Sequence, residues 1–128
     1  MQSRSRNSEA ALRFAERRRR EDAAPRLREV VPALATLRLE IDERRGTAGT
    51  GDPKHVRLVV VDSAAAMFNV PCGDHACRDG GHDLTDAVLR ALKSGAPRLE
   101  LEDTCHGSIG TASCGAVMHL VLTATYRG

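Results

Sequence analysis

Residues 116–126 read AVMHLVLTATY, and their side chains alternate between two faces, as those of a β-strand do. One face carries Met118, Leu120, Leu122, Ala124 and Tyr126, and the other carries Val117, His119, Val121, Thr123 and Thr125. The stretch therefore predicts a long strand whose two faces differ in polarity.

Three further stretches show the same period. Residues 37–43 (LRLEIDE) and 98–102 (RLELE) alternate apolar and charged side chains, and residues 55–62 place Val56, Leu58 and Val60 on one face. A turn-rich loop, residues 46–53, joins 37–43 to 55–62. Two strands joined by one loop form an antiparallel hairpin, because parallel strands need a long crossover. The sequence thus predicts a small four-stranded, mainly antiparallel sheet.

Residues 83–94 give the clearest helix signal. Asp83 is placed to cap the start, and Gly95 can end the helix in the left-handed conformation. One face of this helix is apolar and consists of Leu84, Ala87, Val88, Ala91 and Leu92. Two N-terminal segments, 8–22 and 25–31, also have helical composition. The predicted fold class is α+β, with one helix (83–94) packed on the sheet and N-terminal helices preceding it.

The chain has 128 residues, of which 41% are hydrophobic and 28% charged, as expected for one small globular unit. Its longest apolar runs fall far short of the ~18 residues that a membrane-spanning helix needs. The polar N-terminus lacks the apolar stretch of a secretory signal. We therefore expect a cytoplasmic protein without membrane contact, divided into an Arg-rich N-terminal helical segment (1–35) and an α+β domain (36–128) that carries all four cysteines.

The net charge of +2 conceals an asymmetry. Residues 1–45 carry 12 arginines and 8 acidic residues, a net charge of +4, whereas residues 46–128 have a net charge of −2. The densest basic run is Arg17, Arg18, Arg19 and Arg20, followed at once by Glu21 and Asp22. Such a run either contacts a polyanion or a protein partner, or forms a solvated helix face. The neighbouring acids and the lack of stacking aromatics favour the solvated face.

All four cysteines lie where regular structure is not expected. Cys72 and Cys77 are in the turn before the helix 83–94, and Cys105 and Cys114 bound the loop between the last two strands. Zinc binds four ligands at tetrahedral corners, and two cysteine pairs can supply them. We expect a structural Zn²⁺ site that pins the two loops together, because a small domain with a thin core often needs such a staple.

Other interpretations of these residues stay open. The thiols can also form two pairs without a metal, disulfides, or a redox-exchange site. His75, His82 and His106 are alternative ligands, each able to replace one cysteine.

Two cysteine pairs at loops beside antiparallel strands resemble the zinc-ribbon class over residues 72–114. Both pair spacings, C-x4-C and C-x8-C, and the helix between the pairs differ from that class. The resemblance implies a structural zinc ion.

Catalytic chemistry finds little support in the sequence. A catalytic zinc keeps an open position, which four cysteine ligands would close. The chain has no C-x-x-C motif and lacks the His-x-Glu of the zinc deaminases. We therefore expect a non-enzymatic binding or adaptor protein. The alternative is a small metal- or thiol-dependent enzyme or redox sensor that uses Cys and His near the metal.

The N-terminal helix is the expected contact element. The apolar stripe of residues 8–22 consists only of Ala11, Phe14 and Ala15, too narrow to bury the helix in the core. A helix of this length is marginal in water by itself, so it needs a partner surface. We expect it to contact a protein or a nucleic acid, or most simply a second copy in a homodimer.

Overall fold

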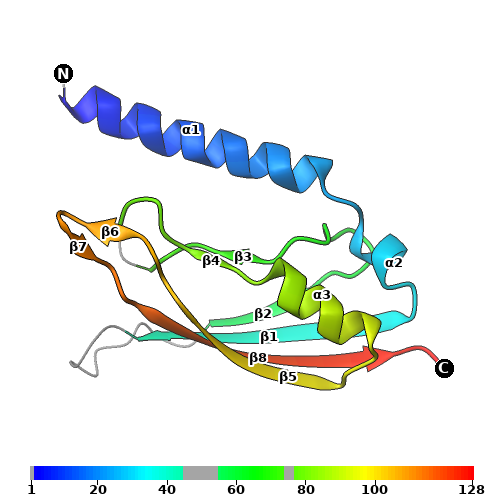
Figure 1. Ribbon diagram of the computed structural model, residues 1–128. Helices are drawn as coiled ribbons and strands as arrows, with labels where there is room; N and C mark the ends of the chain where they lie inside the picture. Colours follow the sequence, from blue (N-terminus) through cyan, green and yellow to red (C-terminus); the bar gives the residue numbers. More distant parts are fainter. Residues whose placement is uncertain (1, 45–54, 74–76) are drawn as a thin grey trace.

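The computed structural model describes residues 2–44, 55–73 and 77–128 (Figure 1). Its main sheet has the strand order β2-β1-β8-β5, and each neighbouring pair is antiparallel. The strands are β1 (Leu34–Arg44), β2 (His55–Val59), β5 (Arg98–Thr104) and β8 (Val117–Tyr126). The predicted four-stranded antiparallel sheet and the α+β class are confirmed.

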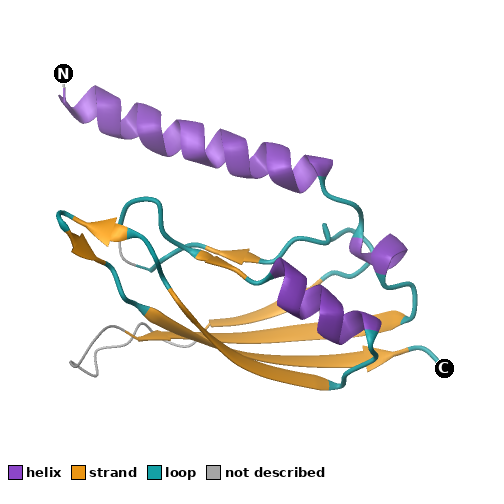
Figure 2. Ribbon diagram, in the orientation of Figure 1, coloured by secondary structure: helices purple, strands orange, loops and turns teal. Residues whose placement is uncertain are grey.

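Helices and short strands lie over one face of this sheet. Two-residue strands form two small pairs, β3 (Asn69–Val70) with β4 (His82–Asp83) and β6 (Ser108–Ile109) with β7 (Ala112–Ser113). The helices are α1 (Gln2–Ala23), α2 (Leu27–Val30) and α3 (Thr85–Lys93). α3 and the β3–β4 pair cover the sheet, and α1 runs beyond them on the same side (Figure 2). No described element covers the opposite face.

The register of the strands explains the core. In β1 and β8, residues that lie opposite each other share a face, so the apolar sets of both strands meet above the sheet. Each of these side chains is at most 4% exposed: Leu37, Leu39, Ile41, Met118, Leu120, Leu122 and Ala124. The alternation in the sequence therefore placed the inner face of both strands correctly.

α3 begins at Thr85 rather than at the predicted Asp83. Asp83 is part of β4, and its Oδ1 accepts a hydrogen bond from the backbone N–H of Thr85 at 3.1 Å. The helix start therefore lies further along the chain, because the backbone is still extended at Asp83. The predicted end is confirmed, since Gly95 has a φ of +76° and donates its N–H to the carbonyl of Leu92.

In the N-terminal region, α1 is largely exposed, whereas the segment that follows it is packed into the core. α1 begins at Gln2, earlier than the predicted start at residue 8, and its side chains from residue 11 onward are exposed or half-buried. Leu27 and Leu34 instead belong to the common core, although both precede the predicted boundary at residue 36. Backbone hydrogen bonds from Leu27 to Ala64 and from Ala66 to Pro25 anchor this region. Within the described residues, no helix has the length and apolar character needed to cross a membrane.

Candidate metal centre

The four cysteines come from two loops at one end of the sheet. Cys72 follows β3, and Cys77 lies in the turn that leads to β4. Cys105 comes directly after β5, and Cys114 directly after β7. The chain leaves the β3–β4 pair toward the end of the molecule where β6 and β7 lie (Figure 1), and the four cysteines of the two loops meet there.

The sulfur atoms have the spacing of a four-thiolate metal site. All four Sγ atoms lie within 4.8 Å of one another, and none is in a disulfide. Sγ of Cys72 is 3.6 Å from that of Cys114, and Sγ of Cys77 is 3.7 Å from that of Cys105. Four thiolates at ~2.3 Å from a tetrahedral ion are about 3.8 Å apart. Each close pair joins one loop to the other, so the predicted cluster of these four cysteines is confirmed.

Backbone contacts close the two loops against each other beside the sulfurs. Arg78 donates its N–H to the carbonyl of Ser108 at 2.7 Å, and Ser108 donates back to Arg78 at 2.9 Å. A Cβ on Gly107 would lie 2.6 Å from the carbonyl oxygen of Arg78 and still closer to Sγ of Cys77. Only glycine permits this approach, so the two loops can meet at the sulfur atoms because residue 107 is glycine.

The thiols differ in acidity. Burial raises the pKa of Cys72 to about 12 and also raises that of Cys77. Burial acts in the same direction on Cys105, but the backbone N–H groups of Gly81 and Gly107 stabilise its thiolate and lower its pKa to about 7. The Gly81 N–H lies 3.3 Å from Sγ of Cys105. Cys105 is therefore the thiol best prepared to bind a metal as thiolate.

A network of His82, Glu43 and Asp103 lies beside the cluster, with Oε1 of Glu43 4.0 Å from Sγ of Cys72. His82 has a fully buried side chain, with Nε2 2.9 Å from Glu43 and Nδ1 2.6 Å from Asp103. Both ring nitrogens therefore have a carboxylate partner within hydrogen-bond distance. Oε1 of Glu43 also accepts the backbone N–H of Gly73 at 2.7 Å. Glu43 thus connects the sheet to the residue that follows Cys72.

The sheet register places this network. Glu43 of β1 and Asp103 of β5 lie on either side of Met118 of β8. The two carboxylates therefore flank one buried methionine on the inner face, and His82 of β4 spans them from above. Because Asp103 is two residues before Cys105, the same row fixes where the second cysteine loop begins.

The sequence carries a signal for the two carboxylates, although neither is among the predicted site residues. Glu43 continues the inner face of Leu37, Leu39 and Ile41, and Asp103 continues that of Leu99 and Leu101. An acid in phase with a buried apolar row indicates a buried polar contact, because an unpaired buried charge is costly. The pairing with His82 could not be read from spacing, since β4 has only two residues.

The alternative ligands lie outside the sulfur cluster. His82 engages the two carboxylates with both ring nitrogens, so neither nitrogen is available to a metal. His106 is exposed. His75 lies outside the described residues. The described part of the chain therefore offers the four cysteines as one ligand set.

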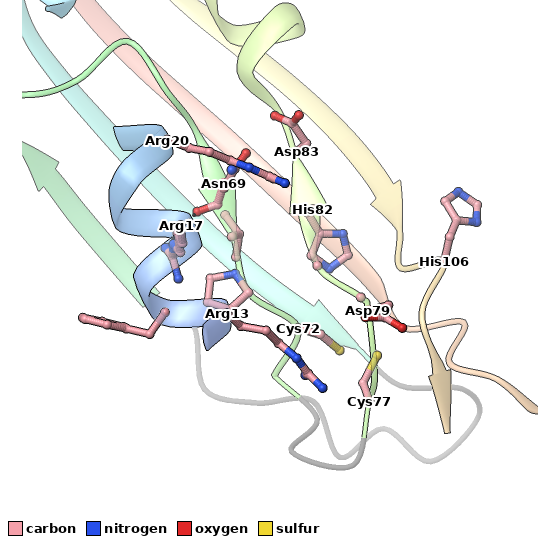
Figure 3. A pocket seen from close by; sticks show the side chains of 15 residues that line it. Arg13, Arg17, Arg20, Asn69, Cys72, Cys77, Asp79, His82, Asp83 and His106 are labelled. Atoms are coloured by element: carbon pink, nitrogen blue, oxygen red, sulfur yellow. Dashed lines mark hydrogen bonds between the residues drawn. The ribbon is translucent and has the colours of Figure 1, made fainter. Parts of the chain in front are cut away.

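A cavity of about 550 Å³ separates α1 from the cysteine loops (Figure 3). Cys72 and Cys77 are on one side, and α1 contributes Arg13, Arg17 and Arg20 on the other. Arg17 donates to the carbonyl of Asn69 at 3.4 Å, a contact that ties α1 to β3. Arg17 and Arg20 of the predicted Arg17–Arg20 contact surface therefore line the cavity beside this chain's own cysteines, although Arg20 is itself exposed. Arg18 and Arg19 are exposed and do not line this cavity.

We expect Glu43→Gln to weaken metal binding about tenfold or more. Glu43 hydrogen-bonds to the loop that carries Cys72, and residues that contact metal ligands in this way orient the ligands and tune the site. Competition with a chromophoric chelator measures this affinity. Glu40→Gln is the matched control, since Glu40 lies on the same strand but on the open face. Equal affinity in both variants and the parent would contradict the role of Glu43.

Metal binding should release more protons at lower pH. Cys72 and Cys77 are protonated near neutral pH in the metal-free protein, and both must ionise to bind. Cys105, with a pKa of about 7, is a thiolate well above that pH and a thiol well below it. The number of released protons should therefore rise by about one as the pH falls through 7, and the apparent affinity should fall with it. Titration calorimetry in buffers of different ionisation enthalpy measures the number, and a constant value would contradict this assignment.

Comparison of the chain with protein-family models, with curated proteins and with solved structures gives no match. The chemistry of the cysteine cluster and the surfaces around it are therefore the basis on which a function can be assigned.

Proposed function

We propose that the chain is a small zinc-stabilised binding module without catalytic activity. The observation that carries this proposal is the gathering of four cysteine sulfurs within 4.8 Å, with no other described ligand group in the cluster. Four thiolates fill the tetrahedral positions of zinc and leave none for water or substrate. A closed site stabilises the fold rather than activating a reactant.

Zinc is the metal that this ligand set favours. Tetrahedral sites of four sulfurs hold zinc or an iron–sulfur centre, and zinc is the ion that structural sites of four cysteines contain. The site lies where two-residue strands and loops have little core of their own, so the ion would supply the stability that burial does not.

α1 would supply the contact surface for a partner with an acidic surface. A divalent ion with four thiolates has a net charge of −2, which Arg13, Arg17 and Arg20 would face across the cavity. Arg17 and Arg20 also pair with Glu21 at 3.6 Å and Glu16 at 2.8 Å. Arg18 and Arg19 remain directed to solvent as the residues for an external contact.

A thiol-based redox sensor is the second candidate. The two cross-loop sulfur pairs, at 3.6 and 3.7 Å, are close enough to form disulfides after a small movement. With hydrogen peroxide as oxidant, each pair of thiolates would give one disulfide, while the peroxide would be reduced to two hydroxide ions and the metal released. Release of the metal by stoichiometric peroxide, reversed by a dithiol, would favour this candidate.

The first test concerns the metal. We expect about one zinc ion per chain after purification without chelator, and loss of tertiary structure when it is stripped. Cys105→Ser should lose the metal and melt at a much lower temperature. The matched control is His106→Ala, which removes the adjacent exposed side chain and should keep both metal and stability. Metal analysis and thermal unfolding decide; full zinc content in Cys105→Ser, or loss of zinc in His106→Ala, would contradict the ligand set.

The second test concerns the basic surface. If α1 binds a polyanion, the affinity for labelled RNA or DNA oligonucleotides should fall steeply with salt. Arg18→Ala/Arg19→Ala should reduce that slope by about 1.4–1.8, whereas Arg17→Ala/Arg20→Ala should change it less. Fluorescence anisotropy measures both. Absence of binding at low salt would leave the run as a solvated helix face.

A further inference from the structure

The two edges of the main sheet are built differently. β5 ends the sheet on one side and presents Arg98, Glu100 and Glu102 on the open face, where charge opposes pairing with another strand. β2 ends it on the other side. There Val56 and Leu58 of β2 are 51% and 73% exposed, and Val60, which directly follows the end of β2, is 67% exposed. β2 is therefore an unprotected apolar edge.

The described residues of the chain give these side chains no apolar cover. Val56 lies opposite Glu40 and Leu58 opposite Arg38, both on the open face, and Arg38 and Glu40 form an ion pair at 2.7 Å. The inner face of β1 is filled by Leu37, Leu39 and Ile41, so β2 cannot turn its strip inward without losing its register. The strip is available to a partner strand.

We propose that β2 pairs antiparallel with β2 of a second copy of this chain, giving one continuous eight-stranded sheet. The side chains of the strip read Val, Leu, Val, the same in both directions. A two-fold axis at Leu58 puts Leu58 opposite Leu58 and Val56 opposite Val60. The surface is thus complementary to itself, as a two-fold interface requires.

The charge of Arg57 favours a two-fold axis at Leu58 over one at Arg57. A two-fold axis at Arg57 would set Arg57 against Arg57, and like charges directly opposite on neighbouring strands are destabilising. The axis at Leu58 sets Arg57 against Val59 instead. In that register the strips of both copies merge on the open face, bordered on each side by the Arg38–Glu40 ion pair.

α1 offers a poorer surface for self-association. Among the described side chains of α1, from residue 11 onward, the large exposed apolar residues are Leu12 and Phe14, at 66% and 65% exposure. Two residues correspond to about 200° around a helix, so these side chains point to opposite sides and form no common patch. The pairing through β2 depends neither on the metal nor on the basic surface of α1, so its failure would leave the proposed function standing.

Sedimentation velocity of the full-length metal-loaded chain over a range of concentrations tests the pairing. The parent protein should dimerise, and Leu58→Lys and Leu58→Glu should each raise the dissociation constant about tenfold or more, because like charges would face each other across the axis. An equimolar mixture of these two variants should recover the dimer. Leu12→Lys is the matched control, with the same chemistry and similar exposure on α1, and should behave as the parent.

A parent protein that stays monomeric throughout would overturn the proposal. So would a dimer that Leu12→Lys abolishes and Leu58→Lys keeps, or a mixture of the two Leu58 variants that stays monomeric. Metal content and circular dichroism check that the variants are folded. Amide exchange of residues 55–60 in the parent gives a reading without any substitution: protection should increase with protein concentration, and exchange that is independent of concentration would also overturn the pairing.

Discussion

One buried row across the sheet determines where the cysteines meet. Glu43, Met118 and Asp103 lie side by side on three strands, and His82 spans the two carboxylates. Glu43 also holds the loop of Cys72 through the N–H of Gly73. Removing the Glu43 carboxylate would leave the buried ring of His82 without one hydrogen-bond partner, at a cost of roughly 1–3 kcal/mol. The sulfur cluster is therefore built on a rigid part of the sheet, although its ligands lie in loops.

The two faces of the sheet differ in composition and in what covers them. The inner face is apolar and packs under α3, whose Val88 and Leu92 are almost completely buried. The outer face carries polar and charged side chains, with contacts such as the hydrogen bond between Nε2 of His119 and Glu100 at 2.8 Å and the Arg38–Glu40 ion pair at 2.7 Å. With a single covered face, the core is one layer deep, and the end occupied by the cysteines lies beyond the cover of α3 (Figure 1). A metal ion held by the four cysteines would add stability at that end, where α3 gives no cover.

The elements that could be predicted are those in which the spacing of apolar residues repeats several times along the chain. β1, β5, β8 and α3 repeat their apolar positions often enough to show which face is buried. The cysteine set could be predicted from ligand chemistry alone. The β3–β4 and β6–β7 pairs could not, because two residues define no period. The place of α1 was also beyond prediction, since a long-range contact such as that of Arg17 with the Asn69 carbonyl leaves no pattern in the sequence.

X-ray absorption at the zinc edge of the isolated protein tests the central claim, that four cysteines close one metal site. The account predicts a single shell of four sulfur atoms at about 2.3 Å from zinc. A nitrogen or oxygen ligand at about 2.0–2.1 Å in place of one sulfur would contradict it, because a histidine or a water would then occupy a position that the four cysteines should fill.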